Sequence, residues 1–208
     1  MRSFLFGIAF ALILISGWMA FTVTSTESTQ RNIIQIHVPA AICSLVCFTL
    51  LFICSIQVLR TTQQTWDYVA AASAEVGFVF ATVLNATGMI FARCEWNAWW
   101  TPSPRLISSA LLWFLYVAYL ILRSSIPAER NKVKICAVFG IIASIDVPLV
   151  VLSARFIPDI HRPSVSFQTP WQYTAFGLAV CGTLLLAALL IWLRADILKT
   201  KVKMDNRP

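Results

Sequence analysis

The chain reads AAASAEVGFVFATVLNATGMIFA over residues 70–92, RCEWNAWWTPSP over 93–104 and RLISSALLWFLYVAYLILR over 105–123. Two long apolar runs therefore flank a short connection that holds three of the chain's eight Trp within five residues. Each run is long enough to cross a bilayer as a helix, which needs about 20 residues. Because indole rings favour the headgroup level, the connection is expected to lie at a membrane surface.

The composition of the whole chain is that of a membrane protein. Hydrophobic residues make up 59% of the sequence and charged residues 12%, and the mean hydropathy is +0.77. A soluble domain usually has about 25% charged residues, so this chain lacks the polar groups to cover a globular surface. The apolar runs are each roughly 18–23 residues long, which fits helices and not the short alternating strands of a barrel. The sequence predicts an all-α, polytopic helix bundle.

Six apolar runs predict six transmembrane helices in a single integral-membrane domain over residues 1–208. The N-terminal run has some features of a signal peptide, but it is long for one, and Trp18 stands where a cleavage site needs a small residue. We therefore expect this run to be retained as the first span. The predicted spans cover residues 4–22, 38–59, 70–92, 105–123, 134–153 and 172–194.

The distribution of Lys and Arg predicts the orientation of the bundle. Cytoplasmic connections carry an excess of these residues, and 11 of the 16 lie on the side that holds both termini. Both termini are therefore predicted to be cytoplasmic, with connections 23–37, 93–104 and 154–171 facing outward. The net charge of +7 mostly reflects this bias and implies no nucleic acid as a partner. The basic tail, residues 196–208, is expected to be solvated and to face anionic membrane lipid.

The six Cys show neither the pattern of a disulfide framework nor zinc-ligand spacing. Cys43 and Cys47 are one helical turn apart, but core packing explains the pair better than metal binding does. Cys94 is the one Cys in a connection. The other five lie in apolar runs, where Cys behaves as a small hydrophobe, and they are Cys43, Cys47, Cys54, Cys136 and Cys181.

The two His of the chain, His37 and His161, both fall in outward connections. His37 closely precedes Pro39, which is predicted in the first turn of the second span, where a missing N–H has no cost. Two imidazoles on one side of the membrane are able to supply both axial ligands of a heme iron. A surface His is more often a simple hydrogen-bonding residue, so the ligand hypothesis depends on what surrounds the pair.

Trp96, Trp99 and Trp100 supply those surroundings. One interfacial Trp is ordinary anchoring, but three this close, followed by Arg105, offer a flat aromatic surface beside a cation. Indole rings stack on a macrocycle or against its edge, and a guanidinium pairs with propionates through charge-assisted hydrogen bonds. We predict that the three Trp form a heme platform and that Arg105, with Arg162 as a second candidate, holds the propionates.

Two acidic residues lie within predicted spans. A charged group at membrane depth usually faces the bundle interior or a partner subunit, so we interpret Glu75 as a polar contact between helices. Pro148 frees a backbone carbonyl and is expected to kink the fifth span, with Asp146 capping or holding the kink. The inner connections, 60–69 and 124–133, are too short for a nucleotide-binding domain, and the chain has no Gly-rich phosphate loop. Any ATP hydrolysis is therefore expected from a partner.

These motifs resemble those of the heme exporter protein C (CcmC) family. The resemblance covers nearly the whole chain and includes the six-span plan, IHVPAA at residues 36–41, the Trp-rich connection, Leu115-Tyr116 and Val147-Pro148. Within the family's Trp motif, the matching residues are Trp96, Trp99, Arg105 and Leu106, and Trp100 is a further Trp common there. Four positions depart from the motif: its Gly is Asn97 here, its last Trp and its Asp are Pro102 and Ser103, and its final Thr is Ile107.

The resemblance implies a multi-pass protein of the bacterial inner membrane that handles heme b during cytochrome c maturation. His37 and His161 match the family's two external His, which the resemblance implies are the axial ligands of the heme iron. It also implies partners, namely the ATPase and membrane subunits of an ABC transporter and a periplasmic heme chaperone that receives the heme. The chain itself would be a binding and transfer subunit and not an enzyme, since the ATPase activity belongs to a partner.

Two other functions remain open. The altered motif at Pro102 and Ser103 is compatible with a heme-free scaffold subunit of the same complex. A bis-His electron-transfer cytochrome is the other alternative, but such proteins usually place their His within helices at membrane depth, and no His falls in a predicted span. The related heme lyases are generally larger, with more spans and more His.

Overall fold

Seven helices make up the part of the chain that the computed structural model describes, residues 1–22, 29–127, 130–157 and 169–205. They are α1 (Arg2–Thr22), α2 (Thr29–Thr61), α3 (Gln64–Trp96), α4 (Pro104–Ser125), α5 (Arg130–Ala143), α6 (Asp146–Phe156) and α7 (Pro170–Asp205). Six stretches of these residues are long and apolar enough to cross a membrane, and α5 with most of α6 counts as one of them. The predicted all-α bundle of six transmembrane helices is confirmed.

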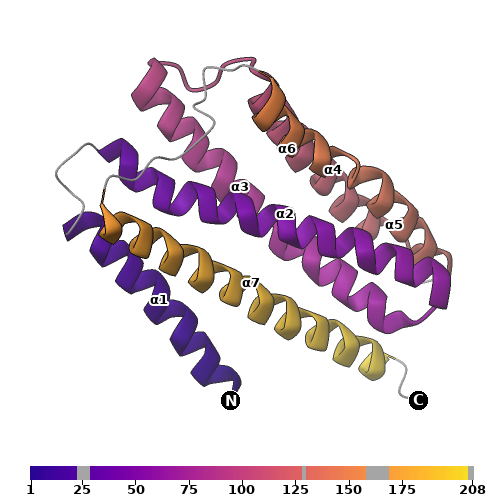
Figure 1. Ribbon diagram of the computed structural model, residues 1–208. Coiled ribbons are helices and arrows are strands. Elements are labelled where there is room, and N and C mark those ends of the chain that lie inside the picture. The colour runs from indigo at the N-terminus through magenta and orange to yellow at the C-terminus, as the bar shows by residue number, and fades with distance from the viewer. Residues whose placement is uncertain (23–28, 128–129, 158–168, 206–208) are drawn as a thin grey trace.

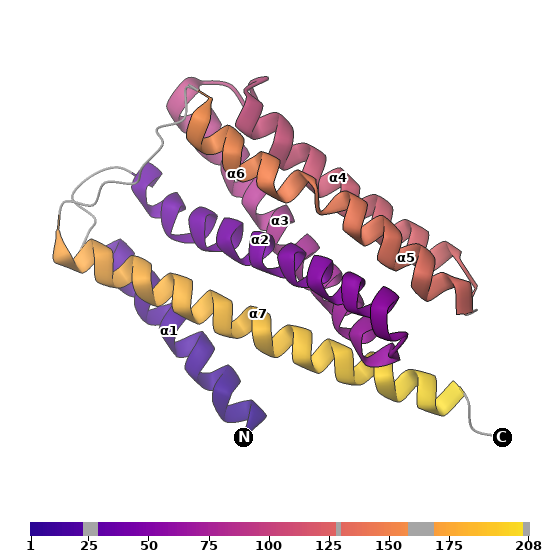
Figure 2. The same cartoon turned by 45° about the vertical axis from the view of Figure 1, so that its right-hand side comes forward.

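Helices α2 and α3 lie side by side at the centre of the bundle (Figures 1 and 2). The pair α1 and α7 packs on one side of them, and α4, α5 and α6 pack on the other. The start of α1 and the end of α7 lie at one end of the bundle (Figure 1), which we call the terminal end. The opposite end holds Trp96 and is called the Trp end. The assignment of the terminal end to the cytoplasm stays a prediction from the charge distribution.

Small residues of α3 bring it close to α2. A Cβ built on Gly77 would lie 2.5 Å from the ring of Phe48 and 2.9 Å from the Cβ of Cys47, so the ring of Phe48 fills the space that a side chain would need. Lipid tails are as apolar as Leu, so close packing is a main source of helix association in a membrane. Six alanines of α3 are buried as well: Ala70, Ala71, Ala72, Ala74, Ala81 and Ala92.

Aromatic side chains extend this core to α4. Phe48 stacks on Tyr116 with ring centroids 3.4 Å apart and planes 17° apart, and both residues are fully buried. The hydroxyl of Tyr116 lies 3.4 Å from Oγ of Ser144, so its polar atom has a partner. Cys43 and Cys47 are buried in a second apolar cluster between α2, α3 and α7, which confirms their predicted role in core packing.

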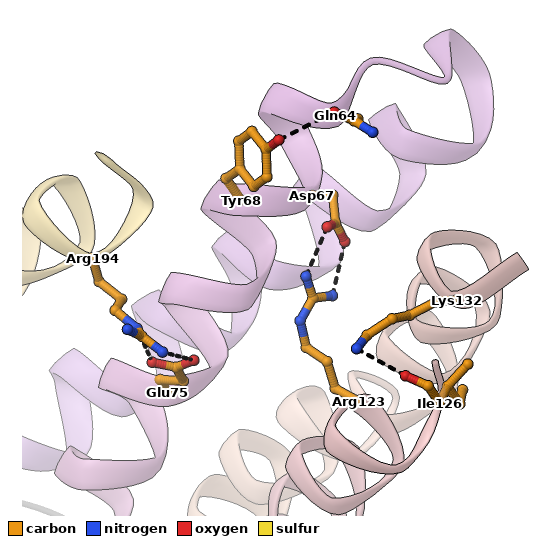
Figure 3. Close-up of polar contacts among 8 residues, drawn as sticks. All are labelled: Gln64, Asp67, Tyr68, Glu75, Arg123, Ile126, Lys132 and Arg194. Carbon is orange, nitrogen blue, oxygen red and sulfur yellow. Dashed lines mark hydrogen bonds and ion pairs between the residues drawn. The ribbon is translucent and has the colours of Figure 1, made fainter. Parts of the chain in front are cut away.

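Two ion pairs join α3 to its neighbours in the half of the helix nearer the terminal end (Figure 3). Arg194 of α7 donates to both carboxylate oxygens of Glu75, with Nη2 and Oε1 3.0 Å apart, so the prediction that Glu75 is a polar contact between helices is confirmed. Arg123 of α4 forms a bidentate pair with Asp67, at 2.8 and 2.7 Å, and both side chains are largely buried. Desolvated charges at this depth are tolerated because each has its counter-charge.

The predicted kink of the fifth span is confirmed as a break between α5 and α6. Pro148 has no N–H for the carbonyl of Ser144, and its ring would clash with that carbonyl in a continuous helix. The N–H of Val147 donates to the Ser144 carbonyl instead, at 3.1 Å. The prediction that Asp146 caps the break is wrong: α6 has no side-chain cap, and both carboxylate oxygens of Asp146 are buried without a hydrogen-bond partner in the described chain.

Several helix boundaries also differ from the prediction, and two of them change the position of a residue or segment with a predicted role. Because α2 begins at Thr29, Pro39 lies in the helix interior and not in the first turn. A proline inside a helix leaves the carbonyl four residues earlier, here that of Gln35, without its usual donor. At the other terminus, α7 continues to Asp205, so most of the basic tail predicted over residues 196–208 is helical. Whether it contacts lipid stays a prediction.

Candidate functional site

The Trp-rich connection starts where α3 ends and is followed by a residue with a left-handed backbone conformation. Helix α3 ends at Trp96, and Asn97 has φ 54° and ψ 24°, the left-handed conformation in which many helices end. Gly adopts this conformation readily and Asn next best. Nη1 of Arg93 donates to the carbonyl oxygen of Asn97 at 2.6 Å, and a cation in the last turn also complements the helix dipole.

The connection finishes at the capped start of α4. Ser103 has an extended backbone, and its Oγ accepts a hydrogen bond from the N–H of Leu106 at 3.4 Å, as an N-cap residue does. Pro104 takes the first helical position, where no N–H is needed. Arg105 follows in the first turn and is half-buried. The guanidinium and the positive end of the helix dipole therefore coincide, and together they favour an acidic group nearby.

The three Trp of the predicted platform have different surroundings. Trp96 meets Phe91 edge to face, with ring centroids 6.0 Å apart and planes at 86°. The guanidinium carbon of Arg93 lies 6.0 Å from the centroid of the Trp99 ring, at the limit of a cation–π contact. Trp99 and Trp100 are 57% and 47% exposed. Two rings therefore present open indole surface at the Trp end, whereas Trp96 is partly covered.

His37 is held within α2, against α3. Since α2 begins at Thr29, His37 lies inside the helix and inside the apolar stretch Ile33–Thr61. The prediction that His37 falls in a connection is therefore wrong, because α2 starts well before the predicted span, which began at residue 38. Nδ1 of the imidazole lies 3.1 Å from Oγ1 of Thr87. A Cβ added to Gly88 would lie 3.1 Å from Cε1 of the same ring.

The structure brings His37 and the Trp residues to the same end of the bundle, on adjacent helices. Thr87, which contacts His37, and Trp96 are about 13 Å apart along the axis of α3. Phe91 lies one turn beyond Thr87 on the same face of α3 and contacts Trp96. It therefore lies between the position of His37 and that of Trp96 along the helix. The predicted second ligand, His161, and the second propionate candidate, Arg162, lie outside the described residues, and their roles stay predictions.

Two residues near this site were not identified from the sequence. One is Arg93, although a cation in the last helical turn before a Trp cluster is itself a signal, given the helix dipole. Thr87 gave no local signal. Its relation to His37 depends on the register between α2 and α3, which no short motif encodes.

Comparison with known proteins relates the chain to one family. The model of a family described as heme exporter protein C matches residues 1–207. The heme exporter protein C of Escherichia coli K12 is 27% identical over 194 residues, which cover 90% of this chain and 79% of that protein. The Rhodobacter capsulatus protein of the same name is 24% identical, covering 91% and 82%. A putative cytochrome c biosynthesis ccmC-like mitochondrial protein of Marchantia polymorpha is 25% identical, covering 80% and 67%.

Proposed function

The chain belongs to the heme exporter protein C family, and from that premise we propose that it holds heme b at the outer face of the membrane and delivers it to a periplasmic heme chaperone. The family and the six apolar helices make it a multi-pass inner-membrane protein of heme transport in cytochrome c biogenesis. In this proposal residues 1–208 act as a single heme-handling domain.

The observation that carries the proposal is the gathering of His37, exposed indole rings and Arg105 at one end of the bundle. These residues fit a heme by their chemistry. An imidazole is a common axial ligand of heme iron, open indole faces match the apolar macrocycle, and a guanidinium in a helix first turn matches carboxylates. His37 and His161 would hold the heme iron as its two protein ligands.

Each neighbouring residue has a separate task in this proposal. Trp99 and Trp100 bind the flat surface of the heme through their exposed rings, and Trp96 supports them from α3. Arg93 orients Trp99, because its guanidinium is tied to the carbonyl of Asn97 while it lies over the Trp99 ring. Arg105 pairs with the propionates and so sets which edge of the heme points toward the helices.

The proposed complex divides the work between subunits. We assign ATP hydrolysis to the ATPase subunit of an ABC transporter, with membrane subunits beside this chain, because the inner connections are too short to hold a nucleotide-binding domain. The chain is then a binding and transfer subunit, without enzymatic activity of its own. Heme leaves it for the periplasmic chaperone, and hydrolysis by the partner drives release of the loaded chaperone.

An absorbance spectrum tests the axial ligands. Wild-type protein purified from heme-replete cells is expected to show a Soret band, and the His37→Ala/His161→Ala variant, at matched expression, is expected to lack it. Each single variant should show a shifted, weaker band because one axial position is lost. A Soret band of unchanged intensity in the double variant would refute the ligand assignment. The absence of a band in folded wild-type protein supplied with heme would favour a heme-free scaffold.

A pair of Trp variants tests the platform. Trp99→Leu is expected to lower heme occupancy several-fold, because a stacked aromatic contact is worth about 0.5–1.5 kcal/mol beyond its buried area. Trp171→Leu serves as the control: Trp171 is 60% exposed in the first turn of α7, but it lies outside the Trp-rich connection. Equal loss in the two variants would mean that both Trp serve only as membrane anchors.

One observation favours a second candidate, a membrane electron-transfer cytochrome. His37 lies inside α2 and within the candidate membrane span Ile33–Thr61, so for this one of the two His the objection that no His lies within a span no longer holds. Reversible reduction of the bound heme by a quinol at a catalytic rate would support this alternative. Slow reduction, together with transfer of heme to the chaperone, would support heme delivery.

A further inference from the structure

The contact between His37 and Thr87 specifies where the hydrogen atoms are. Oγ1 of Thr87 lies 2.7 Å from the carbonyl oxygen of Val83, one turn earlier in α3, and 3.1 Å from that of Leu84. Nδ1 of His37 lies 3.1 Å from the same Oγ1. A hydroxyl has a single hydrogen, and a carbonyl oxygen is only an acceptor, so the short contact to Val83 uses the hydrogen of Thr87.

The imidazole must then be the donor toward Thr87. With its hydrogen directed to Val83, Oγ1 of Thr87 has only lone pairs to offer Nδ1 of His37. A neutral imidazole carries one N–H, so this contact selects the tautomer in which Nδ1 is protonated and Nε2 has the lone pair. The reverse arrangement would take the Thr87 hydrogen away from the Val83 carbonyl.

Gly88 limits where the ring can lie. A Cβ on Gly88 would be 3.1 Å from Cε1 and 3.6 Å from Nδ1 of His37, so the ring rests against the bare backbone of α3. A Cβ there would require the imidazole to shift by a few tenths of an ångström. Two residues therefore position the same ring. Thr87 holds it by a hydrogen bond, and Gly88 leaves space for it because it has no side chain.

We propose that Thr87 and Gly88 form a seat that holds the His37 ring and keeps Nε2 as its metal-binding nitrogen. A His that binds a metal usually donates its other N–H to a fixed acceptor, which sets both tautomer and orientation. Thr87 is thus a positioning residue. The assignment of the tautomer stands on the hydrogen bonds alone, whereas its use in binding iron rests on the proposed function.

The tautomer is measurable without heme. The chain has two His, so the His161→Gln variant contains His37 alone and gives one set of imidazole ¹⁵N resonances. In the heme-free variant at about pH 8.5, two units above the ordinary His pKa, Nδ1 is expected to be pyrrole-like and Nε2 pyridine-like. Adding Thr87→Val should mix the tautomers, and adding Thr87→Ser should not. A pyrrole-like Nε2 in the Thr87 protein would overturn the proposal.

Heme binding supplies the second test. In the chain with both His, Thr87→Val is expected to weaken heme affinity about 10–100-fold, as loss of an outer-shell hydrogen-bond partner typically does. Gly88→Ala is expected to weaken it less, because a Cβ there requires a ring shift of only a few tenths of an ångström. Thr87→Ser should bind nearly as the wild type does. Thr183→Val is the matched control, because Thr183 also donates to the carbonyl four residues earlier in its helix, at 2.6 Å, and is half-buried in α7.

The outcomes separate the two proposals. If His37→Ala abolishes heme binding but Thr87→Val leaves both affinity and midpoint potential unchanged, the seat is wrong and the proposed function stands. If His37→Ala retains heme, the ligand assignment is wrong, and the ¹⁵N spectrum still decides the tautomer. Equal weakening by Thr87→Val and Thr183→Val would show a general loss of helix stability and would overturn the specific role of Thr87.

Discussion

At Asn97 the backbone conformation decides which residues are acceptable. Its φ of 54° is left-handed, which costs most residues about 1–2 kcal/mol and Gly almost nothing. We expect Asn97→Gly to leave the melting temperature nearly unchanged and Asn97→Val to lower it by several degrees, measured by thermal unfolding in detergent. Ala98→Val is the control, since Ala98 is in the same connection with a negative φ. Equal effects of the two Val variants would contradict this interpretation.

Two of the four departures from the family's Trp motif exchange residues that suit the same backbone conformation. Asn97 stands where the motif has Gly, and both residues tolerate the left-handed helix end. Ser103 stands where the motif has Asp, and both are good N-cap residues for the helix that follows. The backbone of the connection is therefore compatible with both sets of residues. The sequence motif alone did not reveal this compatibility.

Between elements, the buried pair of Asp67 and Arg123 fastens α3 to α4. Removing one partner leaves a buried charge uncompensated, which typically costs about 3–5 kcal/mol. We expect Asp67→Asn to reduce the melting temperature strongly and the double variant Asp67→Leu/Arg123→Met to regain most of the loss. The control is Arg2→Met, which breaks the more exposed pair of Arg2 with Asp196 and should cost less than about 1 kcal/mol.

A single observation would contradict the prediction for this pair. If the double variant is less stable than Asp67→Asn alone, the ion pair stabilises the bundle more than an apolar pair at the same positions does. Circular dichroism and size-exclusion chromatography of both variants would distinguish loss of packing from loss of the helices themselves.

Hydropathy located every membrane-crossing helix but misplaced several ends. Residues 29–37 read TQRNIIQIH, too polar to extend an apolar run, so nothing in the pattern indicated that α2 begins at Thr29. The break between α5 and α6 was predictable, since Pro148 acts on its own helix. The partners of Asp67 and His37 were not predictable, because each depends on how two helices are rotated against each other.

For the whole molecule, the distribution of Lys and Arg predicts that the Trp end faces the periplasm. Cys94 is exposed at the Trp end, so we expect a membrane-impermeant maleimide to label it in intact spheroplasts, and Cys94→Ser to remove that labelling. Asp205→Cys, made in the Cys94→Ser background, should be labelled only after permeabilisation because it lies at the terminal end. Cys181 is also exposed but lies within the apolar α7, where the reagent does not reach. The opposite pattern of labelling would invert the predicted orientation.

The central helices are longer than the membrane is thick. α3 has 33 residues, or about 50 Å at a rise of about 1.5 Å per residue, against a hydrocarbon layer of about 30 Å. An ordinary tilt of about 20° shortens its vertical span by only about 3 Å. If the extra helix length is divided equally between the two ends, each end of α3 extends through the headgroup layer. Trp99 and Trp100 would then lie at the boundary between headgroups and water. Under the proposed function, the heme chaperone would therefore receive heme from the aqueous side and would not have to enter the lipid.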